Sequence, residues 1–210
     1  MILFVRGREN RSGALWVRLP AWGACLVLLA LLAGCAGKVG YGDAGAVETV
    51  TLDFGSTDLQ WIAEKMVGSL LASPVLKGDE PPVLQMSRFR NKTDEHIDTK
   101  AITDKIRTAL VQSGKVRFTA AEVRDEIVDE LEYQQKSGYV SEETRKQIGN
   151  MIGADYLLTG GMTSIRKRSG RQTDLYFLVT LNLVDLRTAL VAWSEQKEIR
   201  KRATRPLLGW

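Results

Sequence analysis

Few residues of this chain have the types and spacing that catalysis requires. The 210 residues include a single histidine, His96, and two cysteines, Cys25 and Cys35. A histidine-based metal site normally needs a second histidine or a cysteine, and a hydrolase with a nucleophile elbow needs a G-x-S-x-G motif, which the sequence lacks. We therefore expect no catalytic residue, no metal and no cofactor, and we interpret His96 as a polar loop residue before a helix.

The motif with the clearest chemistry is Leu32-Ala33-Gly34-Cys35, which matches a bacterial lipobox. In proteins with this motif the cysteine thiol receives a diacylglycerol, the chain is cut before the cysteine, and the new amine is usually acylated. Two or more acyl chains anchor a protein stably, because each buried methylene contributes roughly 0.8 kcal/mol. Residues 21–33 are uncharged and follow a basic stretch, but thirteen helical residues rise only about 20 Å. They are too short to cross a bilayer and indicate a secretory signal.

Removal of residues 1–34 would leave a chain that is almost neutral. The full sequence has 29 Lys and Arg against 25 Asp and Glu, and four of these arginines and one glutamate lie in the removed segment. The remaining charge, about +1, gives no support for nucleic-acid binding. Cys25 would leave with the signal and Cys35 would carry lipid, so we expect neither a disulfide nor a free thiol.

The mature chain divides into a tether and one domain. Glycines are frequent between Ala36 and Ala46, which indicates a flexible tether. We expect a lipoprotein signal peptide over residues 1–34, the lipidated cysteine and its short tether over 35–48, and a globular domain over 49–210. The composition, 44% hydrophobic and 26% charged, is typical of a soluble fold.

Helical periodicity dominates the first two thirds of this domain. Capping residues and apolar spacing predict four helices: from Ser56 or Thr57 to about 71, from Asp98 to 114, over 120–135, and from Ser141 to about 152. In the third helix we expect Val123, Ile127 and Leu131 to face inward. Short strands are expected over 83–89 and 116–119.

The last third has the two-residue period of strands. Residues 155–168, 174–185 and 190–200 are strand candidates, and hydrophobic residues alternate from Leu175 to Leu183 in the second. The turns between them predict an antiparallel meander. The expected fold is α+β, with a mixed, largely antiparallel sheet flanked by about four helices. The Gly160-Gly161 pair lies within the first strand and indicates a bulge or close backbone packing.

Basic residues gather in two segments, 166–171 and 200–205. Exposed Lys and Arg are ordinary in turns and chain ends, so both segments can be solvated surface. Equally, they can form an electrostatic docking surface for an acidic partner or an anionic lipid surface. Both interpretations stay open at this point.

Several segments together resemble the penicillin-binding-protein activator lipoprotein family, LpoB. They follow the lipobox in the family's order and cover nearly all of the mature chain. The segments are 56–60 (STDLQ), 95–99 (EHIDT), 102–116 (ITDKIRTALVQSGKV), 153–160 (GADYLLTG), 180–185 (TLNLVD) and 198–200 (EIR).

The resemblance implies an outer-membrane lipoprotein that faces the periplasm, and Ala36 after the lipidated cysteine is compatible with that location. Family members bind a non-catalytic docking domain of a bifunctional class A penicillin-binding protein and stimulate this peptidoglycan synthase. The implied fold is related to the N-terminal domain of TolB-type proteins. Well-known members have a long Pro-rich tether, whereas the tether here is short and Gly-rich.

We expect a non-enzymatic activator that contacts its synthase through Tyr156, Arg166, Arg168 and Tyr176. One alternative is a structural subunit of an outer-membrane secretion or assembly complex. Another is a periplasmic hydrolase that uses His96.

Overall fold

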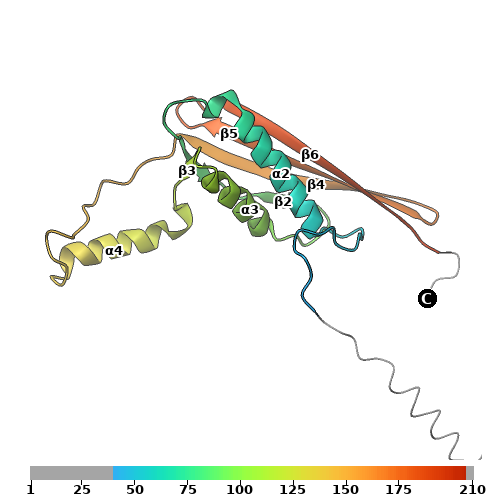
Figure 1. Ribbon diagram of the computed structural model, residues 1–210, viewed down its shortest axis with the longest axis horizontal. Coiled ribbons are helices and arrows are strands. Elements are labelled where there is room, and N and C mark those ends of the chain that lie inside the picture. The colour runs from blue at the N-terminus through green and yellow to red at the C-terminus, as the bar shows by residue number, and fades with distance from the viewer. Residues whose placement is uncertain (1–39, 207–210) are drawn as a thin grey trace, which may run out of the picture. The chain divides into compact units, whose positions relative to one another are not determined.

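The computed structural model describes residues 40–206 of the chain (Figure 1). The predicted signal peptide and Cys35 lie outside these residues. Contacts divide the chain into two units, Met1–Ala44 and Gly45–Trp210, and the second contains every helix and strand described below. None of the helices within residues 40–206 is long and apolar enough to cross a membrane.

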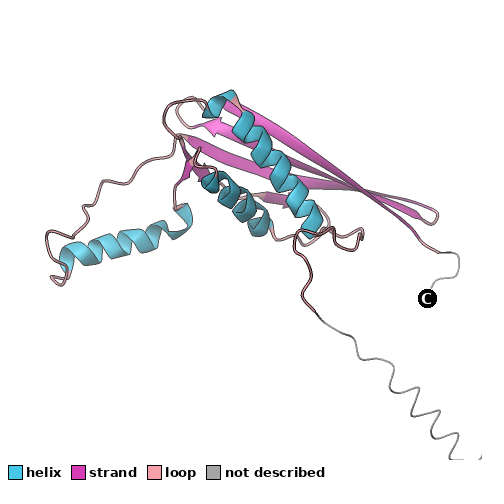
Figure 2. Ribbon diagram, viewed as in Figure 1, coloured by secondary structure: helices cyan, strands magenta, loops and turns pink. Residues whose placement is uncertain are grey.

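Three α-helices and two short 3-10 helices form the helical part (Figure 2). Their bounds are α2 Ser56–Ala72, η1 Pro74–Leu76, α3 Thr99–Gln112, η2 Ala121–Val123 and α4 Arg124–Lys136. The start of α3 is the predicted one, because the Asp98 carboxylate accepts hydrogen bonds from the N–H groups of Lys100 and Ala101. The predicted cap of α2 by Ser56 or Thr57 is wrong, because both residues lie within the helix and Gly55 is its cap residue. The Glu48 carboxylate accepts a 3.2 Å bond from the Thr57 N–H instead.

Six strands form one sheet, with β3-β1-β4-β5-β6 as the main order and β2 paired to β4. The strands are β1 Val83–Met86, β2 Arg90–Lys92, β3 Arg117–Phe118, β4 Tyr156–Ser169, β5 Gln172–Asp185 and β6 Val191–Thr204. The pairs β1–β3, β1–β4 and β2–β4 are parallel, and β4–β5–β6 is the predicted antiparallel meander. The α+β fold with a mixed, mostly antiparallel sheet is confirmed.

One face of the sheet is covered by α2 and α3 (Figure 1). Alternate β5 residues from Leu175 to Leu183 are buried, as the sequence period predicts. They pack against apolar stripes at helical spacing on α2 and α3, namely Ile62, Met66, Leu70, Ile102, Ile106 and Leu110. Every residue of this core lies between Leu52 and Ile199. The fragment 36–210 therefore keeps the whole core, and we infer that it folds without the preceding segment.

Two helical predictions are wrong. The expected helix from Ser141 to about 152 is only a turn, in which Thr144 and Arg145 donate their N–H groups to the Ser141 carbonyl. Gly149 adopts a φ of 99°, outside the helical region. The third predicted helix exists as α4, but it has no buried residue, and Val123 and Ile127 are exposed instead of facing inward.

The paired glycines of β4 confirm close backbone packing. A Cβ on Gly160 would lie 2.4 Å from the Thr180 carbonyl oxygen of β5. A Cβ on Gly161 would lie 2.8 Å from the Arg90 carbonyl oxygen of β2. The ladder of β4 with β5 runs through both positions without a register shift. The pair thus lets three strands approach one another where β2 joins the sheet.

Candidate functional site

The second face of the sheet, which we call the open face, is the first candidate surface. It carries the odd-numbered residues of β4 and the even-numbered residues of β5 and β6, because the buried residues of β5 are odd-numbered. Among the helices of residues 40–206, only α4 reaches it, where Arg124 donates to the Gln85 side chain at 3.4 Å. Because no other helix within residues 40–206 covers it, the open face is a candidate surface for a partner.

A shallow hollow of about 260 Å³ lies on the open face where β2 meets β4. Two cations of β2, Arg90 and Lys92, border it, and neither forms an ion pair within the described part of the chain. Hydroxyl and amide groups complete the lining, from Thr159, Thr163, Thr180 and Asn182. The missing side chain of Gly161 keeps the hollow open. This arrangement suits carboxylates or other hydrogen-bond acceptors on a partner.

Cations on the helix-covered face are instead held by groups of the protein itself. Lys201 binds Asp58 at 2.5 Å, and these side chains are only 9% and 4% exposed. Lys65 pairs with Glu195 at 3.3 Å. These two lysines are therefore engaged within the protein, unlike Arg90 and Lys92.

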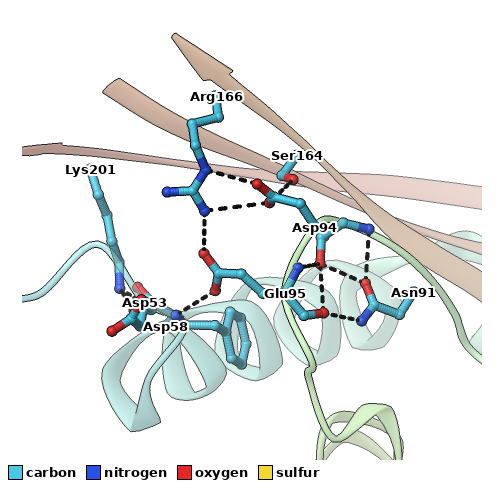
Figure 3. Close-up of polar contacts among 10 residues, drawn as sticks. Asp53, Asp58, Asn91, Asp94, Glu95, Ser164, Arg166 and Lys201 are labelled. Carbon is cyan, nitrogen blue, oxygen red and sulfur yellow. Dashed lines mark hydrogen bonds and ion pairs between the residues drawn. The ribbon is translucent and has the colours of Figure 1, made fainter. Parts of the chain in front are cut away.

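Arg166 of β4 lies at the centre of a polar network (Figure 3). Its Nε donates to the Asp94 carboxylate at 2.8 Å, and its Nη2 donates to Glu95 at 2.9 Å. The other oxygen of Glu95 accepts the Phe54 N–H at 3.0 Å. The guanidinium thus joins β4 to the loop before α3. Through its bond to Phe54, Glu95 links the same loop to the segment that precedes α2.

Protonation of Asp94 is disfavoured by this network. Hydrogen bonding to Arg166 holds the pKa of the Asp94 carboxyl below its usual value, with a smaller contribution from Ser164. The same carboxylate raises the pKa of Arg166. Arg166 therefore acts here as a positioning residue for the loop.

The long β4–β5 hairpin ends in a second cationic surface. We call residues 167–174 of the hairpin and 200–205 of β6 and its continuation the hairpin tip. Strand pairing places the two segments side by side, with Gln172 opposite Thr204 and the Arg205 N–H bonded to the Arg171 carbonyl at 2.9 Å. Apart from Arg166, which its own network holds, the two basic segments of the sequence thus lie side by side.

The four predicted contact residues do not form one patch. Tyr176 lies on the open face, where the Arg200 guanidinium stacks 5.5 Å from its ring. Arg166 and Tyr156 are half-buried on the helix-covered face, ten residues or roughly 33 Å apart along β4. Arg168 is exposed at the hairpin tip. Their role in binding stays a prediction, and the cations of β2 were missed because two isolated basic residues in a short strand give no signal in the sequence.

His96 lies exposed in the loop before α3, as the sequence predicts. It borders a pocket of about 500 Å³ between the starts of α2 and α3, together with Phe54 and Ile97. The neighbouring Asp98 is engaged as the cap of α3. Within residues 40–206 no cluster of three or more His, Cys, Asp or Glu residues is placed to hold a metal.

Solved structures with similar folds include two LpoB domains. The C-terminal domain of LpoB from Escherichia coli is 17% identical, with a TM-score of 0.42, and the match covers 68% of this chain and 98% of that one. The C-terminal domain of LpoB from Salmonella enterica is 17% identical, with a TM-score of 0.41 and coverage of 69% and 99%. A PelC dodecamer from Paraburkholderia phytofirmans matches at 18% identity and a TM-score of 0.31, covering 59% and 74%.

The curated proteins gave no match. A protein-family model, described as peptidoglycan-synthase activator LpoB, matches residues 58–199. These bounds span the structure from the first turn of α2 into β6 and include the open-face hollow and Arg166 with its partners Asp94 and Glu95. The chain therefore belongs to the LpoB family of peptidoglycan-synthase activators.

Proposed function

We propose that this protein is an outer-membrane lipoprotein, anchored through Cys35 and facing the periplasm, that binds and activates a class A penicillin-binding protein. The observation that carries the proposal is the family match over residues 58–199, which takes in nearly all of the folded body. The lipobox supports the anchor, and the protein acts by binding instead of by catalysis.

The open face is the surface that we propose for the synthase. Arg90 and Lys92 are exposed there without acidic partners in the described chain, so docking a carboxylate costs no internal ion pair. Activation requires that this surface bind the active conformation of the synthase more tightly than the inactive one, because equal affinities would leave the equilibrium between the two conformations unchanged.

Binding and activity of a purified class A penicillin-binding protein test the proposal. We would titrate it with fragment 36–210 and measure both the affinity and the rate of glycan polymerisation. We expect saturable binding and faster polymerisation. Absence of binding by the unaltered fragment would overturn the activator function itself.

Charge reversals separate the open face from other surfaces. Arg90→Glu with Lys92→Glu should lower the affinity at least tenfold, since each interfacial charge contact contributes on the order of 1 kcal/mol or more. The matched control, Lys105→Glu with Lys115→Glu, changes the net charge equally at exposed positions on and after α3. If the control weakens binding as much, the open face is not the docking surface.

The anchor needs its own experiment. The full chain should incorporate radiolabelled palmitate and fractionate with the outer membrane, whereas Cys35→Ser should do neither. Label retained by the Cys35→Ser variant would show that the lipobox cysteine is not the site of acylation.

A further inference from the structure

We propose that the hairpin tip is a second membrane contact, which binds the phosphate headgroups of anionic lipids in the membrane that holds the protein. This inference rests on the anchor at Cys35 that is part of the proposed function. It concerns a different surface from the open-face hollow assigned to the synthase.

Charge at the hairpin tip is almost entirely positive and available. Of its seven cations, Lys201 is bound to Asp58, and Arg202 is bound to Asp174 at 2.7 Å. The other five are exposed and form no ion pair with any described residue: Lys167, Arg168, Arg171, Arg200 and Arg205. Asp174 is the only acid within the two segments, and hydrogen bonding to Arg202, aided by the charges of Arg200 and Lys167, lowers its pKa.

Apolar groups stand among these cations on the open side of the hairpin. Ile165 is 66% exposed and lies directly opposite Tyr176 in the β4–β5 ladder. Tyr176 in turn lies under the Arg200 guanidinium. A mixture of cations, an aromatic ring and an exposed aliphatic side chain fits the boundary between lipid headgroups and acyl chains.

The hairpin tip also lies toward the tethered end of the body. Lys201 donates to the Asp53 carbonyl, so β6 touches the entering segment just before α2. The last residue of β6, Thr204, is three positions further along the strand, or roughly 10 Å. The chain therefore enters the body close to its most cationic surface.

The length of the tether favours a membrane over a protein as the partner of the hairpin tip. Glu48 is already hydrogen-bonded to the start of α2, and it lies thirteen positions after Cys35. Even fully extended, thirteen residues span at most about 45 Å. A body held this close to a bilayer meets its lipid surface continually, and each Lys or Arg near an anionic surface increases partitioning by about fivefold.

Vesicle co-sedimentation tests the inference without the anchor. Fragment 36–210 would be mixed with vesicles of phosphatidylcholine alone, or of phosphatidylcholine with one third phosphatidylglycerol. We expect binding only to the anionic vesicles, and loss of that binding at high salt. Lys167→Glu, Arg171→Glu and Arg205→Glu together should reduce partitioning by at least about a hundredfold. The matched control reverses Lys77, Lys115 and Arg187, three exposed cations outside the hairpin tip.

The outcomes separate this inference from the proposed function. Equal loss in both triple variants would show that only net charge matters, and equal binding to neutral vesicles would remove the electrostatic basis; either result overturns the proposal. If the tip variant keeps vesicle binding but loses affinity for the purified synthase, the tip is a protein interface and the membrane proposal fails. Vesicle binding by a fragment that does not bind the synthase would support the tip while contradicting the activator function.

Discussion

Lys201 is predicted to be the cation on which the stability of the folded body depends most. Its ammonium binds the Asp58 carboxylate at 2.5 Å, with both side chains more than nine-tenths buried. Lys201→Met keeps the length of the side chain and removes the charge, which leaves Asp58 buried without its cation. Removal of one partner of a buried pair costs about 3–5 kcal/mol.

The expected loss lies at the lower end of that range, about 3 kcal/mol. Asp58 would still accept the Gly55 N–H at 2.9 Å, and it lies in the first turn of α2, where the helix dipole favours a negative charge. For a domain of this size, 3 kcal/mol corresponds to a decrease in Tm of roughly 6–12 °C. Urea and thermal unfolding of fragment 36–210, followed by circular dichroism, would measure it.

Two further variants make the prediction refutable. Asp58→Asn keeps an acceptor for the Gly55 N–H, so adding it to Lys201→Met should recover stability and give a coupling energy of about 2 kcal/mol. Lys197→Met, on the same face of β6, removes only a cation 5.8 Å from the Trp61 ring and should cost about 0.5 kcal/mol. Equal effects of the two lysine substitutions, or zero coupling, would refute the assignment of a buried pair.

Three other predictions concern single contacts. N–H groups at the start of α2 lower the pKa of Glu48, so its stabilising effect is present above its unfolded pKa of about 4.5 and is lost as the pH falls through the lower folded value. Unfolding measured across that range should show less acid dependence for Glu48→Gln than for the wild type. Gly160→Ala should lower the free energy of unfolding in urea by about 1–3 kcal/mol, because its Cβ would meet the Thr180 carbonyl. An unchanged free energy of unfolding would contradict close packing of β4 against β5. Trp193→Phe removes the 3.2 Å bond from the indole N–H to the Ser69 hydroxyl and should cost about 1 kcal/mol in urea unfolding. Ser69→Ala also removes the Ser69 bond to Glu195 and should cost at least as much, and no loss in either variant would contradict a stabilising role of these bonds.

Local patterns predicted the elements that a buried face determines. The alternation from Leu175 to Leu183 predicted β5, because the two-residue period repeats along the strand. Asp98 predicted the start of α3, because the cap bonds an N–H group only two residues away. The helix expected after Ser141 failed because none of its residues is buried, and capping alone stabilises a helix weakly. The helical period of α4 was predicted correctly, but the burial of its apolar stripe was not, because the period does not show whether another element covers the stripe.

Pairing between distant segments explains what the sequence could not reveal about the candidate surfaces. Arg166 has its partners at Asp94 and Glu95, more than seventy positions away. The two basic segments become one hairpin tip only through the register of β5 with β6, and a shift of one residue would move the side chains of β6 to the opposite faces. Spacing along the chain carries no information about either relation.

The outer edge of the sheet has a consequence for how copies of this protein coexist. β6 ends the strand order, and along its fourteen residues no further strand covers it within the described chain. A bare edge of this length would invite a neighbouring molecule to extend the sheet, above all for proteins crowded in the plane of a membrane. Six of its residues are charged: Glu195, Lys197, Glu198, Arg200, Lys201 and Arg202. Charged side chains on an exposed edge strand disfavour the addition of another strand, so the charge of β6 protects the domain against edge-to-edge aggregation at high surface density.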